Sequence, residues 1–397
     1  MSILSAQVQG YMERSSWIRR MFESGIELKK QYGEDQVCDF SLGNPDLPPP
    51  ACVGTALHEI ADEACAPFAF GYMPNFGYPH VREALAKEVS REQGVAVAAA
   101  DLVITCGAAG AINAFYRAVL EPGDEVLCPS PYFVEYGFYV ENHGGLLKTA
   151  PAKRGTFELD VEALAAAITA KTRVVLINSP NNPTGVVYPR ESLVALTEML
   201  TRKSAGRPRP ILLLADEPYR FLAFDGVEVP SLLPLYAHTV VVSSFSKNLS
   251  LAGARVGYAL VNPAMPGKEE LVSGIILANR ILGFVNAPAL AQKLLAKTLG
   301  AQVDAQIYAS RRDAMRQVLD AAGYTYPLPR GAFYFFPAAP GGDDVAFVNL
   351  LLEERILAVP GSGFGCPGHF RLAFCVGENV IRRAQDGFKR AMEKVKK

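Results

Sequence analysis

One lysine, Lys247, lies in a segment whose residue types suit covalent catalysis. The apolar run 239–242 before it is typical of a buried strand, and a second β-branched stretch begins at Arg255. An amine in this position can form a Schiff base with a carbonyl compound, while Ser244, Ser246 and Arg255 hold an anion beside it. The alternative is a solvated loop lysine, so the choice depends on the partners that the rest of the chain supplies.

A carboxylate and an amide follow two other predicted strands. Asp216 comes directly after the apolar run 212–215, where a carboxylate is costly without a partner. A protonated pyridine nitrogen would be such a partner; a metal ion is the competing explanation, but no second ligand has suitable spacing. Asn182 lies in the octet 178–185, which reads either as a polar turn or as a site where its amide donates to a phenolate oxygen.

Two weaker signals complete the set of candidate residues. Gly107, Ala108 and Ala109 follow a strand and open a helix, where free backbone N–H groups can bind a phosphate, although small residues there also serve packing alone. Arg371 interrupts an aromatic and aliphatic strand. It is either a surface arginine or a bidentate clamp for a substrate carboxylate.

The elements that position these residues alternate from residue 101 onward. Short apolar runs predict strands, and amphipathic segments between them predict helices. Such alternation favours a mainly parallel sheet covered on both faces, with the ligand at the carboxyl ends of the strands, where the motifs fall. The predicted strands are 102–106, 125–128, 173–178, 211–215, 239–243 and 255–260, and the predicted helices are 111–120, 161–168 and 191–200.

The two ends of the chain predict a second, smaller unit. Near the N-terminus an amphipathic helix is expected over 15–30, capped by Ser15 or Ser16. After residue 263 the pattern is mostly helical and then changes to short strands before a C-terminal helix. We therefore expect residues 1–48 to complete a small α+β domain formed by 286–397, with 49–285 as the large domain.

The overall composition excludes several classes of protein. Half of the 397 residues are apolar and the net charge is −1, which gives no reason to expect nucleic acid or an acidic membrane as a partner. No window holds the roughly 18 uninterrupted apolar residues of a membrane span, and no secretion signal is recognisable. Seven cysteines without a CxxC pair favour reduced thiols, and five scattered histidines show no ligand spacing for a metal site. These features favour a cytoplasmic protein.

The order of the motifs resembles that of fold-type I, class I/II aminotransferases of the aspartate aminotransferase superfamily, which depend on pyridoxal 5'-phosphate (PLP). The resemblance runs from Gly43 to Arg371. Asn182-Pro183-Thr184-Gly185 matches a family motif, Asp216 with Tyr219 matches another, and Ser244-x-x-Lys247 with Arg255 matches the Schiff-base lysine and phosphate clamp. The resemblance implies the α/β PLP-dependent transferase fold, in which a seven-stranded, mainly parallel sheet is accompanied by a smaller α+β domain.

Further roles follow from the resemblance alone. Tyr72 matches the tyrosine that reaches the cofactor phosphate of the neighbouring subunit, which implies a homodimer with composite active sites. Phe133 stands where the family stacks an aromatic ring on the pyridine, Gly43 where it lines the substrate carboxylate site, and Arg371 where it binds the α-carboxylate. The turn at 107–109 departs from the family by lacking a hydroxyl or lysine, so phosphate binding must rely more on backbone N–H groups and the clamp.

The implied reaction is a ping-pong transamination between an amino acid and a 2-oxo acid. Lys247 holds the cofactor and then moves a proton from the substrate Cα, and Asp216 keeps the ring nitrogen protonated. Tyr219 and Asn182 hydrogen-bond the phenolic oxygen of the cofactor, and Asn182 also lies on the substrate side. The expected catalytic residues are therefore Lys247, Asp216 and Tyr219.

The choice of substrate depends on the segment 278–288. Arg280 lies one residue away from the position where acidic-substrate members offer a second arginine, and the alternative is a helix-end arginine bonded to carbonyl groups. We expect aspartate as the favoured donor, with 2-oxoglutarate as an acceptor. The alternative is an aromatic amino acid in a pocket formed by Tyr11, Trp17, Phe22, Tyr136 and Phe284.

Three other functions compete with transamination. A PLP-dependent lyase or decarboxylase of the same fold would keep every residue named above. A PLP-binding regulatory module would need a DNA-binding extension or basic patch, which the sequence lacks. A dinucleotide-dependent dehydrogenase would need a Gly-x-Gly-x-x-Gly turn, which Gly107-Ala108-Ala109-Gly110 does not supply.

Overall fold

A computed structural model of the chain describes residues 3–14 and 16–395, and within these ranges the side chains of 14, 16–20 and 22 are not described. The predicted N-terminal helix is present as α2 (Ser16–Tyr32), while Ser15 lies outside the described residues. A shorter helix, α1 (Ala6–Arg14), precedes it. Within the described ranges, no helix is both long and apolar enough to cross a membrane.

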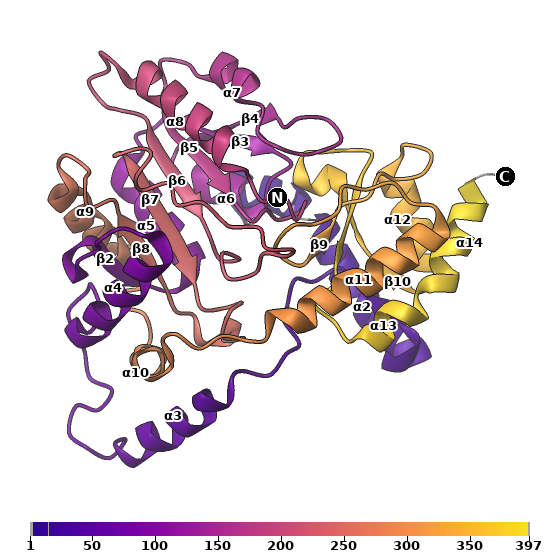
Figure 1. Cartoon of the computed structure of the whole chain (residues 1–397), viewed down its shortest axis with the longest axis horizontal. Helices are drawn as coiled ribbons and strands as arrows, with labels where there is room; N and C mark the ends of the chain where they lie inside the picture. The colour runs from indigo at the N-terminus through magenta and orange to yellow at the C-terminus, as the bar shows by residue number, and fades with distance from the viewer. Residues whose placement is uncertain (1–2, 15, 396–397) are drawn as a thin grey trace.

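A seven-stranded sheet lies in the left-hand part of the molecule in Figure 1. Its order is β2-β8-β7-β6-β5-β3-β4, and every strand is parallel to the others except β8, which is antiparallel to both of its neighbours. This confirms the predicted mainly parallel sheet. The strands are β2 (Leu102–Thr105), β3 (Glu125–Ser130), β4 (Leu146–Pro151), β5 (Thr172–Asn178), β6 (Leu212–Asp216), β7 (Thr239–Ser244) and β8 (Gly257–Val261).

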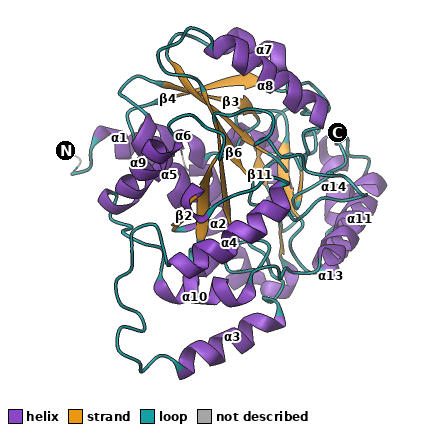
Figure 2. Ribbon diagram, turned by 60° about the vertical axis from the view of Figure 1, so that its left-hand side comes forward, coloured by secondary structure: helices purple, strands orange, loops and turns teal. Residues whose placement is uncertain are grey.

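Helices cover both faces of this sheet (Figure 2), because the strand residues are apolar on both sides and must be buried on both. One face packs against α4 (Pro79–Gln93), α7 (Val161–Ala167), α8 (Arg190–Ser204) and α10 (Ala289–Thr298). The other face packs against α5 (Gly107–Val119), α6 (Glu135–Glu141) and α9 (Lys268–Ile281). Helix α3 (Ala51–Asp62) lies beside α10.

The pairing register brings the polar strand ends side by side. Asn178 at the end of β5 pairs with Asp216 at the end of β6, and Ser244 at the end of β7 pairs with Gly257 of the next strand. Parallel neighbours end at the same edge of a sheet, so their terminal side chains and following loops gather there. The predicted site residues in and after these strands, from Asn182 and Asp216 to Ser244 and Lys247, therefore share one edge.

A second hydrophobic core joins the two ends of the chain. Cys38 of β1 (Cys38–Asp39) pairs in parallel with Ile356 of β10 (Ile356–Leu357), so the N-terminal segment is tied to the last quarter of the chain. A three-stranded antiparallel sheet lies beside this pair, with β12 (Phe370–Ala373) between β11 (Val359–Pro360) and β9 (Tyr334–Phe335). The covering helices are α11 (Ala305–Ala322), α12 (Asp344–Glu353), α13 (Glu378–Arg383) and α14 (Gln385–Val395).

Candidate active site

A cavity of about 380 Å³ lies at the carboxyl ends of β5, β6 and β7, and Tyr334 and Arg371 of the three-stranded sheet also line it. Most of the predicted site residues line it, although they come from positions more than three hundred residues apart. Those lining the cavity are Gly43, Ala108, Ala109, Phe133, Asn182, Asp216, Tyr219, Ser244, Ser246, Lys247, Arg255 and Arg371. The individual roles assigned to them stay predictions.

Three predicted residues do not line the cavity. Gly107 begins α5 with φ +73°, and a Cβ added to it would lie 3.0 Å from Nη2 of Arg255, so it lets the arginine approach the start of the helix. Tyr72 is almost fully exposed, with 99% of its surface accessible. Arg280 is exposed near the end of α9. Neither Tyr72 nor Arg280 therefore contributes to the cavity within the single chain.

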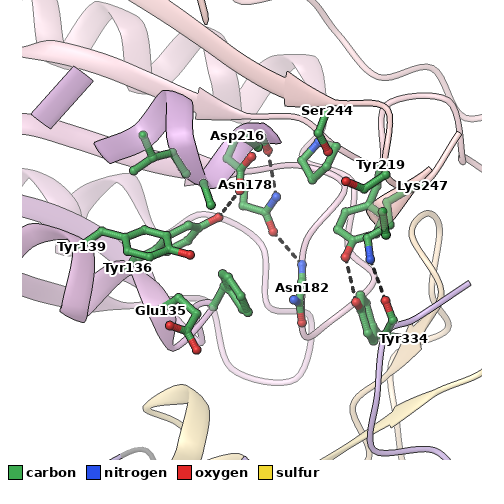
Figure 3. A pocket seen from close by; sticks show the side chains of 18 of the residues that line it. Glu135, Tyr136, Tyr139, Asn178, Asn182, Asp216, Tyr219, Ser244, Lys247 and Tyr334 are labelled. Carbon is green, nitrogen blue, oxygen red and sulfur yellow. Dashed lines mark hydrogen bonds between the residues drawn. The ribbon is translucent and has the colours of Figure 1, made fainter. Parts of the chain in front are cut away.

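Asp216 is the most buried carboxylate of the cavity wall (Figure 3). Its Oδ2 accepts a hydrogen bond of 2.5 Å from the Tyr136 hydroxyl, whereas Oδ1 is buried with no partner among the described residues. Burial raises the pKa of this carboxyl to about 7, against the lowering effect of the Tyr136 bond. An unpaired buried carboxylate oxygen is the feature that a protonated pyridine nitrogen would complement.

Two amides connect the strand ends to Arg371. The side-chain amide of Asn178 donates to the backbone oxygen of Asp216 (2.8 Å), and its Oδ1 accepts from the backbone N–H of Asn182 (2.7 Å) (Figure 3). The Asn182 Oδ1 in turn accepts from Nη1 of Arg371 at 3.1 Å. Because its oxygen is engaged there, the NH₂ end of the Asn182 side chain is the one left to donate to a ligand.

Arg371 is a buried cation, and not all of its N–H donors have a hydrogen-bond partner. Its guanidinium lies 4.9 Å from the ring centre of Tyr334 and 4.8 Å from that of Phe364, and Nη2 donates to the backbone oxygen of Ser41 at 2.5 Å. Its Nε is buried and unpaired within the described structure. Burial lowers the pKa of the guanidinium. A planar cation held between two rings with an unused donor suits a bidentate carboxylate.

Lys247 lies in the turn after β7 and its Nζ donates to the backbone oxygen of Gly43 at 2.6 Å. Burial lowers the pKa of this amine to about 8, with the nearby Cys375 acting in the opposite direction. A lysine with a pKa near neutrality has a substantial neutral fraction, which is the form that attacks a carbonyl group.

The cavity wall formed by the end of β7, Arg255 and the start of α5 contains the hydroxyl, guanidinium and backbone N–H donors that suit a phosphate. Ser244 is the last residue of β7 and Ser246 follows two positions later. Arg255 adopts a left-handed conformation with φ +53°. The α5 N-terminus with Ala108 and Ala109 supplies backbone N–H groups at the positive end of a thirteen-residue helix. A Cβ added to Gly257 would lie 2.7 Å from the backbone carbon of Gly107, so only a glycine lets β8 and α5 approach this closely.

Tyr334 and Glu135 are among the residues of the cavity wall that the sequence did not identify as site residues. The Tyr334 hydroxyl lies 2.7 Å from that of Tyr219, yet the uniformly apolar run around Tyr334 gives no sign of this contact. The Glu135 carboxylate forms no ion pair with a described side chain, and burial raises its pKa. Its position two residues after Phe133 was the available signal.

The aromatic pocket proposed from the sequence is only partly visible. Tyr136 lines the cavity, but its hydroxyl serves Asp216. Tyr11 packs edge-on against Phe138 at a ring distance of 5.0 Å, and Phe284 is 38% exposed. The side chains of Trp17 and Phe22 lie outside the described residues.

Comparison with known proteins places these features in context. The profile of the aminotransferase class I and II family matches residues 35–388. The chain is 32% identical over 382 residues to an aspartate/prephenate aminotransferase of Thermus thermophilus, with 92% of this chain and 93% of that protein covered. It is likewise 32% identical over 394 residues to an aspartate aminotransferase of Geobacillus stearothermophilus, with 94% of each covered.

Solved structures of aminotransferases are also similar to this chain. An aminotransferase from Eubacterium rectale is similar with a TM-score of 0.95 and 37% identity, and the alignment covers 100% of both chains. The aspartate aminotransferase of Thermus thermophilus with maleate is similar with a TM-score of 0.87 and 30% identity, covering 98% of this chain and 100% of that one.

Proposed function

Since the chain belongs to the class I and II aminotransferase family and is a transferase of the EC 2.6.1 type, we propose that it moves the amino group of an L-amino acid to a 2-oxo acid such as 2-oxoglutarate, with PLP as cofactor. The observation that carries this proposal is the convergence of three groups in one cavity: the amine of Lys247, the unpaired oxygen of Asp216 and the unpaired Nε of Arg371.

The cavity residues fit PLP. Asp216 would pair with the ring nitrogen, Tyr219 and Asn182 would hydrogen-bond the phenolic oxygen, and Phe133 would cover one face of the ring. The phosphate would bind at the start of α5, with the donors of the far wall, which are Ser244, Ser246, Arg255 and the backbone from Gly107 to Ala109. When bound, the cofactor supplies an electron sink for the negative charge that develops at the substrate Cα.

The chain's own residues supply binding, orientation and proton transfer. Arg371 fixes the α-carboxylate beside Gly43, which orients the Cα–H bond for cleavage. The Lys247 amine takes the Cα proton as general base and returns it as general acid, and its lowered pKa suits both tasks near neutral pH. Asn182 links the two ends of the site because its oxygen accepts from Arg371.

We propose aspartate as the favoured donor. The names of relatives at about 30% identity support it, and Arg280 of a second subunit would pair with the distal carboxylate. An aromatic amino acid is the alternative donor.

A homodimer with composite sites is part of this proposal. Large apolar side chains are exposed near Tyr72 in the sequence, namely Phe68 (93%) and Phe70, and others are exposed on α9 and α10, namely Leu277, Ile281 and Leu290. Exposure of this extent is typical of a surface that a second copy covers. We also propose a cytoplasmic location, and the division into a large domain (49–285) and a small one (1–48 with 286–397).

A turnover assay tests the function. Purified protein with PLP and aspartate should release oxaloacetate in multiple turnovers only when 2-oxoglutarate is supplied, with one glutamate formed for each oxaloacetate. Multiple turnovers without any oxo acid would instead identify a lyase or decarboxylase.

A further inference from the structure

Tyr334 makes a hydrogen bond that connects the three-stranded sheet to the segment after β6 of the large sheet. Its hydroxyl lies 2.7 Å from the hydroxyl of Tyr219, and the two rings are nearly perpendicular, with centroids 5.7 Å apart. Tyr219 follows β6 of the large sheet, whereas Tyr334 belongs to β9 of the three-stranded sheet. Both side chains are buried, with accessible fractions of 4% and 2%. The contact therefore fixes one cavity wall relative to the other.

The position of Tyr334 is set by close backbone packing. A Cβ added to Gly43 would lie 2.1 Å from the Tyr334 hydroxyl, and one added to Gly185 would lie 2.7 Å from its backbone oxygen. On the other side, Tyr334 pairs with Ala373 of β12, two residues after Arg371. Real side chains do not approach this closely, so the two glycines create the space that holds the tyrosine in place.

The number of available protons determines the direction of this hydrogen bond. Each tyrosine hydroxyl carries one proton, and no other described residue hydrogen-bonds either of the two hydroxyls. Burial raises the pKa of Tyr334 to about 12 and also raises the pKa of Tyr219 well above its usual value, so both keep their protons near neutral pH. If Tyr219 donates its proton to a ligand in the cavity, the proton between the two tyrosines must come from Tyr334.

We propose that Tyr334 is a positioning residue, which donates to Tyr219 and thereby directs the Tyr219 proton towards the phenolic oxygen of PLP. This inference rests on the proposed function. A hydroxyl that accepts one hydrogen bond becomes a stronger donor in the next, so the bond to the cofactor is strengthened. A donor at the phenolic oxygen stabilises its ionised form and lowers the pKa of the imine that PLP forms with Lys247.

The same ring also lies 4.9 Å from the guanidinium of Arg371, and a conservative substitution separates the two contacts. Tyr334→Phe removes only the hydroxyl and keeps the ring beside the arginine. Tyr334→Leu removes both. A merely structural role would make the two variants differ only in degree, whereas a donor role gives the hydroxyl an effect of its own.

The test is a pH titration of the absorbance of the PLP-loaded protein, which reports protonation of the Lys247 imine. In Tyr334→Phe the imine pKa should rise by about half to one unit, the size of one neutral hydrogen bond. In Tyr219→Phe it should rise further. The double variant should match Tyr219→Phe alone, because without the Tyr219 hydroxyl the Tyr334 hydroxyl has no connection to the cofactor.

Tyr324→Phe is the matched control, since the buried Tyr324 hydroxyl donates to the backbone oxygen of Phe388 in the same core and Tyr324 does not line the cavity. Its imine pKa should equal that of the parent. An unchanged pKa in Tyr334→Phe, or additive shifts in the double variant, would overturn the proposal.

A second readout uses the amino-acid substrate. The Michaelis constant should stay within about twofold of the parent in Tyr334→Phe and rise clearly in Tyr334→Leu, because only the latter exposes Arg371 on one side. A rise of equal size in both variants contradicts the separation of roles. Borohydride reduction distinguishes the two levels of failure: absence of a pyridoxyl group on Lys247 refutes the proposed function itself, whereas a Lys247 adduct with an unchanged Tyr334→Phe titration refutes only the positioning role.

Discussion

The Tyr136 hydroxyl donates to Oδ2 of Asp216 across 2.5 Å and leaves Oδ1 of the same carboxylate buried without a described partner. Tyr136 comes from α6 on one face of the large sheet, and Asp216 ends β6 at its centre. One oxygen is thus held by the protein and the other is reserved for a ligand, which gives the carboxylate a fixed orientation before any ligand binds.

The Asp216 carboxyl should make the cofactor-free protein less stable as the pH rises from about 4 to about 7. Its pKa is about 7 in the folded chain, above the unfolded value of 3.8, so the folded state holds the extra proton throughout this window. The free energy of unfolding therefore falls with rising pH, by on the order of 2–4 kcal/mol from this group. Urea unfolding of the parent and of Asp216→Asn at several pH values measures it. If the free energy of unfolding depends on pH in the same way in both proteins, the raised pKa of Asp216 is refuted.

Lys247→Ala should lower turnover by about 10⁴-fold or more, because the variant loses both the covalent link and the general base. PLP should still bind weakly through the phosphate site. Lys148→Ala, on the exposed edge strand β4, is the control and should keep parental activity. Borohydride reduction with peptide mass mapping locates the attachment point. A pyridoxyl group on any other lysine would refute Lys247 as the attachment point of PLP.

Tyr72→Phe should raise the dissociation constant of PLP by about tenfold to a hundredfold, the effect of one hydrogen bond to a charged phosphate. The side chain is exposed in a single chain, so the effect requires a second subunit. Cofactor loss on dialysis measures it, and Tyr32→Phe, another exposed tyrosine, is the control. A fully active monomer in sedimentation at assay concentration is the contrary result.

Glu135→Gln should improve kcat/KM for aspartate by about threefold or more, because a carboxylate in the cavity wall repels the distal carboxylate of an acidic substrate. Alanine has no distal charge and should be used equally well by both proteins. Glu162→Gln, on the exposed side of α7, controls for a general change of charge. Equal changes for aspartate and alanine would show that Glu135 does not face the substrate side chain.

Arg280→Ala should reduce activity with aspartate selectively, while alanine and phenylalanine stay near the parental rate. The reason is that only aspartate has a second carboxylate for the guanidinium to bind. Initial rates of the parent and the variant with the three donors show whether Arg280 acts on aspartate alone. Poor use of aspartate by the parent, or equal loss of all three donors, contradicts an acidic pocket.

Sequence patterns predicted the large sheet because its central strands are continuous apolar runs that end in polar residues. The edge strand β4 was not predicted, since Leu146–Pro151 contains a lysine, a threonine and a proline and is mostly exposed. Its assignment depends on the neighbouring strand, because every residue of Glu125–Ser130 pairs with it.

The candidate site shows the same limit. Lys247, Asp216, Asn182 and Arg371 were found because each interrupts or ends a patterned segment. Tyr334 was not found, because its role is inferred from a hydrogen bond with Tyr219, which lies 115 positions away in the sequence. Local pattern carries no information about which distant hydroxyl a buried tyrosine will meet.

The pairing of Cys38 with Ile356 also has a consequence for biosynthesis. A ribosome makes Ser41 and Gly43 early, but Arg371, which donates to the Ser41 oxygen, emerges only when nearly the whole chain has been translated. The large sheet can form while synthesis continues, since its strands end at Val261. The carboxylate-binding half of the site cannot, so a nascent chain that still lacks its last thirty residues has no complete place for an amino acid.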